Sequence, residues 1–156
     1  KREKGGSMRH FRLAILGFVF TFCGLTGVQA SEDVAVGIQG GILGAGLSGK
    51  MMLNDKLTGQ VVLSSVGKFS SLMGRGLYTF KEQKEFDLYG VGELGTWFDG
   101  DGAYFSLGAG IGIETNWQNF IEDIFPLWWS AEIGVGFAAG YTYNPIRTGI
   151  GVHYRF

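Results

Sequence analysis

The chain has 156 residues, a length that allows one domain at most. Its 46% hydrophobic residues stand beside 28 Gly and only 2 Pro, and apart from the amino-terminus no apolar run is long enough for a spanning helix. The formal charge of −1 becomes −5 once residues 1–30 are set aside, because they hold five Lys and Arg but one acidic residue. That balance argues against a nucleic-acid partner, which needs a basic face.

The amino-terminus is predicted to be a secretory signal. Met8–Arg12 supplies a basic start, Leu13–Phe22 an apolar core, and Val28-Gln29-Ala30 a small-x-small cleavage site. The alternative is an uncleaved anchor helix, which the short apolar core and the cleavage site disfavour.

Cleavage after Ala30 divides the chain into residues 1–30, which are the upstream residues plus the signal, and a barrel domain over residues 31–156. It also removes Cys23, the only cysteine, and a thiol-free chain suits an oxidising periplasm. Phe22 precedes this cysteine where a lipoprotein signal needs a small residue, so no lipid anchor is expected.

Alternating side chains predict five strands in the first part of the mature chain. Lys50, Arg75 and Glu93 are expected on the inward faces of the second, fourth and fifth strands, whereas the facing of the third is ambiguous because Val61, Val62 and Leu63 are consecutive. The five expected strands are Asp33–Gly41, Ala45–Leu53, Thr58–Val66, Leu72–Phe80 and Asp87–Phe98. The expected connections are Gly40–Gly44, Asn54–Lys56, Lys68–Ser71 and Lys81–Glu85.

Two further strands show the alternation most clearly. Asp99-Gly100-Asp101-Gly102 is a strong hairpin signal, and it is followed by the predicted strand Ala103–Trp117. In this strand and in the predicted strand Trp129–Tyr143, mainly apolar residues occupy the odd positions and mainly small or polar residues the even ones. Each even face carries one carboxylate, Glu114 or Glu132. Small inward residues leave room for a few large polar ones inside a narrow barrel.

The segment Asn116–Leu127 departs from this alternation. Phe120, Ile121, Ile124 and Phe125 have helical spacing before Pro126, which predicts a short amphipathic helix. Either this helix lies at the inner membrane interface, as amphipathic helices do, or the strand count is off by one.

The last expected strand is Thr148–Phe156, which Asn144–Arg147 connects to the previous one. One face carries four apolar residues, and the other carries two glycines followed by His153 and Arg155. The apolar four are Ile150, Val152, Tyr154 and Phe156.

Eight alternating strands predict an all-β fold, a transmembrane antiparallel up-and-down barrel with a short helix between strands 6 and 7. Aromatic residues at the strand ends are expected to form its two interfacial girdles. The alternative is that these rings are buried in the core of a soluble sheet. The residues concerned are Phe98, Trp117, Trp128, Trp129, Tyr141, Tyr143, Tyr154 and Phe156.

With the signal, the eight strands and the terminal pattern Ile150-Gly-Val152-His-Tyr154-Arg-Phe156, the chain resembles the small OmpA/OmpX-type outer-membrane barrels of Gram-negative bacteria. The resemblance covers the mature chain in architecture, and the carboxy-terminal motif is its specific part. It implies location in the bacterial outer membrane and contact with outer-membrane lipid. It also implies recognition of the terminal motif by the barrel-assembly machinery and escort by periplasmic chaperones. Short external loops depart from the family and weaken any adhesive role carried by loops.

Six charged residues are expected inside the barrel, three carboxylates and three bases. Because unpaired charges are costly in a dry lumen, they predict a structural salt-bridge network. A proton or ion path is the functional alternative, but lumens of this size are filled by side chains. The six are Lys50, Arg75, Glu93, Glu114, Glu132 and Arg155.

No enzymatic activity, cofactor or metal is expected. A hydrolase that modifies lipid A needs a nucleophile close to a base, and no serine lies within two positions of His153, the single mature histidine. One histidine without cysteine forms no transition-metal cluster, and the spaced glycines of 108–112 lie within a strand rather than in a nucleotide loop. The expected role is structural, in envelope integrity or surface interaction. The alternatives are a lipid A-modifying barrel enzyme and a soluble periplasmic lipid-binding β-barrel.

Overall fold

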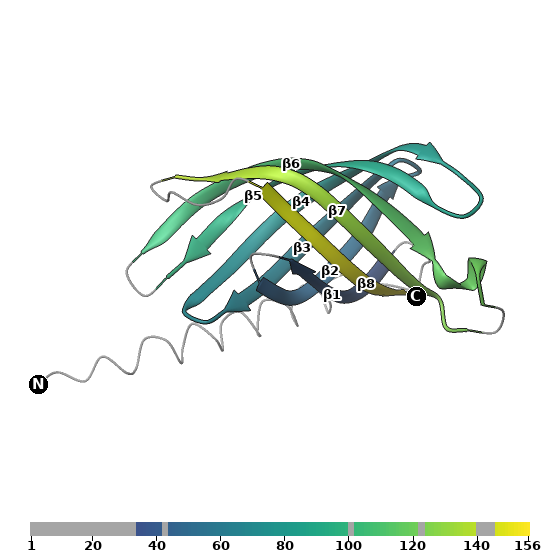
Figure 1. Ribbon diagram of the computed structural model, residues 1–156, viewed down its shortest axis with the longest axis horizontal. Coiled ribbons are helices and arrows are strands. Elements are labelled where there is room, and N and C mark those ends of the chain that lie inside the picture. Colours follow the sequence, from purple (N-terminus) through teal and green to yellow (C-terminus); the bar gives the residue numbers. More distant parts are fainter. Residues whose placement is uncertain (1–33, 42–43, 100–101, 122–123, 140–145) are drawn as a thin grey trace, which may run out of the picture. The chain divides into compact units, whose positions relative to one another are not determined.

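The computed structural model describes residues 34–41, 44–99, 102–121, 124–139 and 146–156. Within these residues, eight strands form a closed antiparallel barrel, in which each strand pairs with its sequence neighbours and the last pairs with the first (Figure 1). The strands are β1 (Val34–Gly41), β2 (Gly44–Asn54), β3 (Leu57–Val66), β4 (Phe69–Glu82), β5 (Asp87–Phe98), β6 (Ala103–Asn116), β7 (Leu127–Ala138) and β8 (Ile146–Arg155). The predicted all-β, eight-stranded, up-and-down barrel is confirmed.

Large apolar side chains cover the outside of the barrel, whereas its inside holds charged and polar side chains together with a few apolar ones, Val62, Met73, Leu77 and Val91. On β6, Phe105 and Ile111 are 52% and 60% exposed, whereas Ser106 is fully buried. The ambiguous facing of β3 is resolved in the same way, because Val61 is 50% exposed and Val62 only 6%. A period of two therefore sets the two faces of the sheet, as the pleat of a strand requires.

Strand β4 begins three residues earlier than expected. Phe69 pairs with Val66 across a two-residue turn, and Gly67 takes the positive φ of 58° in that turn, which glycine adopts without steric cost. Ser70 and Ser71, expected in a connection, are therefore part of the β3–β4 ladder. The hairpin partner, rather than the composition of the segment, sets where the strand starts.

Strand β8 also begins earlier than expected, at Ile146 rather than Thr148. Ile146 pairs with Val135 and Arg147 with Gly134 on β7. The expectation that Ile146 and Arg147 belong to a connection is therefore wrong, and Arg147 gains a position on the strand.

The predicted amphipathic helix over Asn116–Leu127 is wrong in extent. In the described part of this segment, the helical structure is one 3-10 turn, η1 (Trp117–Asn119). Asn116 begins it by accepting a hydrogen bond from the backbone N–H of Gln118 at 3.0 Å. The eight-strand count needs no change.

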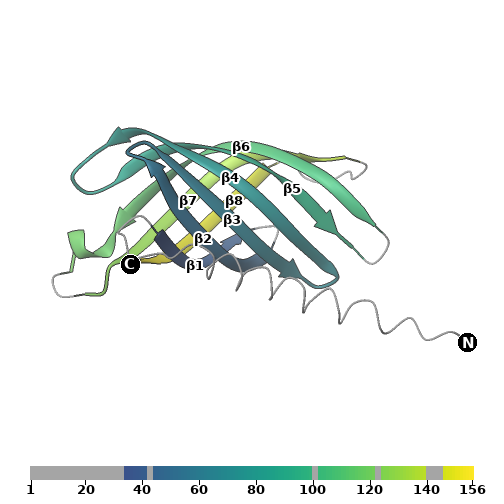
Figure 2. The same ribbon diagram turned by 180° about the vertical axis from the view of Figure 1, so that it is seen from behind.

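The first and last residues of the described chain lie at the same end of the barrel. Ala35 on β1 pairs with Arg155 on β8, and the Phe156 N–H donates to the Val34 carbonyl at 3.0 Å. We call this the terminal end, and it also carries the β2–β3 and β4–β5 turns and the β6–β7 connection (Figures 1 and 2). The opposite end is called the distal end.

Some predictions fall on residues outside the described ranges. These are the signal peptide, the domain boundary at residue 30, Tyr141 and Tyr143 of the predicted aromatic girdles, the end of the predicted strand Trp129–Tyr143, and parts of the connections Gly40–Gly44, Asp99–Gly102 and Asn144–Arg147. In the part of the chain that is described, no helix has the length and apolar character needed to cross a membrane.

Candidate functional site

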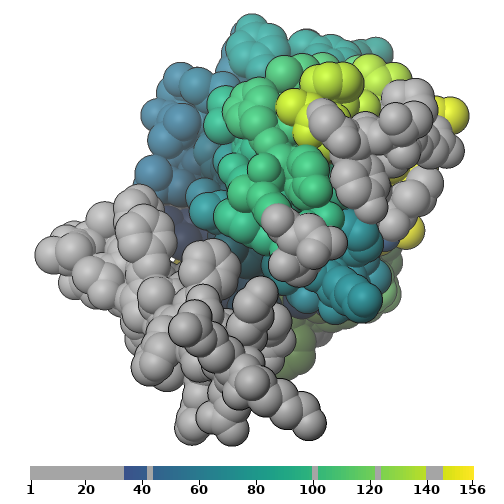
Figure 3. Space-filling view, turned by 90° about the vertical axis from the view of Figure 1, so that its left-hand side faces the viewer, coloured from purple at the N-terminus to yellow at the C-terminus, as the bar shows by residue number. Residues whose placement is uncertain are grey.

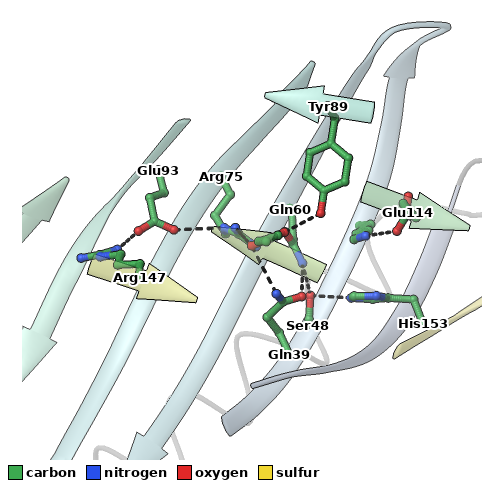
Figure 4. Close-up of polar contacts among 11 residues, drawn as sticks. Gln39, Ser48, Gln60, Arg75, Tyr89, Glu93, Glu114, Arg147 and His153 are labelled. Atoms are coloured by element: carbon green, nitrogen blue, oxygen red, sulfur yellow. Dashed lines mark hydrogen bonds and ion pairs between the residues drawn. The ribbon is translucent and has the colours of Figure 1, made fainter. Parts of the chain in front are cut away.

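The centre of the lumen is organised by Arg75, which projects inward from β4. Its Nε donates to Glu93 Oε2 at 3.2 Å and its Nη1 donates to Gln60 Oε1 at 2.6 Å (Figure 4). Its Nη2 forms an ion pair with Glu132 on β7. The side chain is only 6% exposed, so this guanidinium is held by three acceptors with little access to solvent.

Glu132 accepts hydrogen bonds from three strands besides its own. The Tyr89 hydroxyl of β5 donates to Oε1 at 2.7 Å, and the Gln39 amide of β1 donates to Oε2 at 3.4 Å. Together with Arg75 of β4, these contacts cross the lumen from wall to wall. Figure 4 shows Gln39, Arg75 and Tyr89 pointing into the lumen from separate strands.

Toward the distal end, the network continues from Glu93 to Arg147. Arg147 Nη1 forms an ion pair with Glu93 Oε1, and its guanidinium carbon lies 5.9 Å from the centroid of the Trp97 ring. Glycines make the space for this pair: a Cβ at Gly136 would overlap the Arg147 guanidinium, and one at Gly108 would lie 2.7 Å from Glu93 Oε1. The glycine face of β6 and β7 thus accommodates the large charged side chains.

A second group of polar side chains lies nearer the terminal end. Lys50 on β2 forms an ion pair with Glu114 on β6, with side chains 4% and 13% exposed. Ser48 Oγ shares a hydrogen bond of 2.9 Å with His153 Nε2 and accepts one of 2.7 Å from Gln60 Nε2. Gln60 therefore connects this group to Arg75.

Five of the six residues expected in the network lie in these ion pairs: Lys50, Arg75, Glu93, Glu114 and Glu132. The sixth, Arg155, lies instead over the Trp128 ring, with its guanidinium carbon 3.8 Å from the ring centroid. Arg147 takes its place as the third base. Trp128 was expected in an outer girdle, but it pairs with the buried His153 across β7–β8 and so faces inward.

Arg147 was missed because Asn144 and Pro145 signalled a connection that seemed to include the two residues after them. The alternation of inward and outward positions along the strand would have identified it. Arg147 stands an even number of positions before His153 and Arg155, so it shares their inward face once the strand is extended by two residues.

The expected assembly-signal residues lie on the other face of β8. Ile150 and Tyr154 are 65% and 38% exposed, and Val152 shares their side of the strand. Phe156 is 50% exposed, and its ring meets the Tyr154 ring edge-on at a centroid distance of 5.1 Å. The terminal motif is therefore accessible from outside the barrel.

A cavity of about 100 Å³ lies beside the network in the distal half of the lumen. Its lining includes Gln39, Arg75, Glu93, Trp97 and Arg147. Figure 3 views the barrel from this end, where β5 and β6 (green) lie beside β7 and β8 (yellow-green and yellow). The cavity has room for a few waters, and its lining carries both signs of charge.

No family model matches the chain, and no curated protein or solved structure matches it either. The fold and the lumen geometry therefore carry the functional argument.

The chemistry of this lumen is that of paired charges. Among the described residues, no three His, Cys, Asp or Glu side chains are grouped to hold a metal ion. Ser48 and His153 are within hydrogen-bond distance, which the sequence separation of 105 residues concealed. Both are buried, at 4% and 1% exposed, and His153 Nδ1 has no hydrogen-bond partner in the described part of the chain.

Proposed function

We propose that the protein is an outer-membrane β-barrel with a structural role, in envelope integrity or surface interaction. The observation that carries this proposal is the inverted polarity of the barrel, which is apolar outside and charged inside. A transmembrane barrel turns its apolar face to lipid and encloses its polar residues.

The outer face is apolar on every strand of the barrel. One half-exposed residue from each of β1 to β4 is Ile38, Leu47, Val61 and Leu72, and one from each of β5 to β8 is Leu94, Ile111, Val135 and Ile150. An apolar surface this extensive exceeds what a monomeric soluble protein presents to water. A soluble lipid-binding barrel needs the opposite arrangement, an apolar lumen and a polar exterior, so the geometry favours the membrane barrel.

The contents of the lumen support a closed barrel rather than a pore. Gln39, Gln60, Arg75, Tyr89 and Glu132 are bonded to one another across the lumen. Removing one partner from a buried ion pair costs about 3–5 kcal/mol, so these side chains hold the opposite walls of the barrel together. The network is thus suited to stabilising the barrel.

A lipid A-modifying enzyme remains the second candidate because Ser48 Oγ and His153 Nε2 are 2.9 Å apart. A catalytic triad needs a third group that orients the histidine through its other ring nitrogen, and a substrate must reach the serine. Neither residue lines the described cavity, and both are buried beneath the polar network. This geometry favours a structural hydrogen bond.

Envelope fractionation combined with gel migration tests the proposal. The full chain is expected in the outer-membrane fraction, and it should migrate differently in detergent gels before and after heating, because the closed barrel resists detergent until heated. Recovery in the soluble periplasmic fraction would contradict the proposal. A lipid A profile that is the same with and without the protein is expected, and a changed profile that Ser48→Ala abolishes would favour the enzyme.

A further inference from the structure

In the described part of the β6–β7 connection, residues 117–121 and 124–126, the two amide side chains are used in hydrogen bonds and four large apolar side chains are exposed. The Gln118 amide donates to the Ile124 carbonyl at 3.1 Å, and the Asn119 amide donates to the Glu85 carbonyl of the β4–β5 turn at 3.2 Å. Phe120 and Phe125 are 63% and 73% exposed. A group of large exposed apolar side chains is characteristic of a contact surface.

This arrangement is fixed to the barrel. Thr115 Oγ1 donates to the same Glu85 carbonyl, and the Phe120 and Ile121 N–H groups both donate to the Trp117 carbonyl at 3.0 Å. The hydrogen bonds therefore hold the apolar side chains outward. Trp117 and Ile121 add to the exposed group, at 40% and 49%.

The exposed group continues the outer apolar face of the barrel. On the β7 side, Phe125 is followed by Leu127 and Trp129, part-exposed apolar residues of the outer face of β7, which pair with Tyr154 and Val152 on β8. Figure 1 shows η1 beyond the end of β6, at the same end of the barrel as the carboxy-terminus. The apolar surface thus extends past the strands on this side of the barrel.

We propose that Trp117, Phe120, Ile121 and Phe125 form an interfacial anchor that inserts into the headgroup region of the lipid leaflet at the terminal end. This inference rests on the proposed membrane location and adds one specific contact to it. Aromatic side chains favour the boundary between headgroups and acyl chains, where the polar backbone of the connection keeps its access to water. The anchor fixes the depth of the barrel on the β6–β7 side.

The test places a fluorescent label at single cysteines in the full chain with Cys23→Ser. Phe120→Cys and Phe125→Cys report on the anchor, and both side chains are exposed, so labelling leaves the barrel intact. Asp55→Cys, in the exposed β2–β3 turn at the same end, is the matched aqueous control. Ile111→Cys, on the outer face of β6, reports membrane insertion itself. Each variant is refolded into phosphatidylcholine vesicles, with iodide as aqueous quencher and nitroxide-labelled lipids as membrane quenchers.

Iodide should quench the labels at 120 and 125 several-fold less than the label at 55, and headgroup-level nitroxide should quench them most. If iodide quenches the labels at 120 and 125 as strongly as the label at 55, while mid-chain nitroxide quenches the label at 111, the proposed anchor is wrong but the membrane location is retained. If 111 is also open to iodide, the membrane location fails and the anchor with it. Protection from iodide without lipid quenching would indicate contact with a second copy and would overturn the anchor.

Discussion

At the residue scale, Glu132 is the most connected acceptor of the lumen. It receives the Arg75 guanidinium, the Tyr89 hydroxyl and the Gln39 amide, and its side chain is only 8% exposed. Charge-assisted hydrogen bonds in such a setting are stronger than neutral ones, and the loss of their acceptor leaves buried donors without partners.

Glu132→Leu should lower the free energy of unfolding by about 3–5 kcal/mol, because it leaves Arg75 paired only in part and Tyr89 without an acceptor. Urea unfolding of the refolded barrel in vesicles measures the change. Glu85→Leu replaces an exposed glutamate in the β4–β5 turn and should shift the same free energy by no more than about 0.5 kcal/mol. Equal midpoints for the two variants would contradict a stabilising network.

Glycine allows β6 and β7 to approach each other closely. A Cβ at Gly110 would lie 2.6 Å from the Ile133 carbonyl oxygen and 3.0 Å from the Gly134 Cα, both backbone atoms that move only with the strand. A Cβ at Gly92, on the outer face of the neighbouring β5, would meet nothing within 4 Å.

Gly110→Ala should therefore destabilise the barrel by about 1–3 kcal/mol, as overpacking does. Gly92→Ala is the control and should leave stability within about 0.5 kcal/mol or raise it slightly. The measurement is again urea unfolding. A Gly110→Ala chain as stable as the Gly92→Ala chain would show that β6 and β7 are farther apart than described.

The sequence predicts which side chains of the lumen face inward, because alternation with a period of two fixes the facing of a whole strand from a few clear positions. Arg75, Glu93, Glu114 and Glu132 were placed inward in this way. The partner of each charge was not predictable, because pairing depends on the stagger between strands. Ser48 and His153 are neighbours because β1 lies between β2 and β8 in the closed barrel. No local sequence pattern indicates this closure.

At the element scale, strand ends were less predictable than strand centres. Where β4 and β8 begin depends on the partner strand, because Ser70 and Arg147 continue a ladder whose other half comes from β3 and β7. The prediction of a helix in the β6–β7 connection was wrong for a related reason. Helical spacing of its apolar residues was real, but Gln118 and Asn119 bond to carbonyls outside η1 in place of a continued helix.

Asn119→Ala should release the connection from Glu85 without unfolding the barrel. Limited proteolysis of the refolded chain should then cut faster between β6 and β7, while the free energy of unfolding falls by less than about 1 kcal/mol, as for one exposed hydrogen bond. Lys84→Ala, an exposed change in the facing turn, should leave the cleavage rate unaltered. Equal rates for both variants would mean that the tether is not formed.

At the scale of the whole molecule, closure and polarity belong together. Because β1 pairs with β8, no strand edge is left open in the described barrel, and every strand presents an apolar side outward. Backbone groups paired all the way round are what a lipid environment requires of a spanning sheet. The charges at the centre of the lumen are then tolerated because they are paired with one another.

The alternation along β6 tests this polarity most directly. Single cysteines at Phe105, Leu107 and Ile111, and at the inward Tyr104 and Ser106, are introduced in the Cys23→Ser chain and treated with a membrane-soluble thiol reagent in vesicles. Strong labelling is expected at the first three positions and weak labelling at the other two. Equal labelling of Phe105→Cys and Ser106→Cys, or a processed chain that stays in solution without detergent, would contradict this polarity.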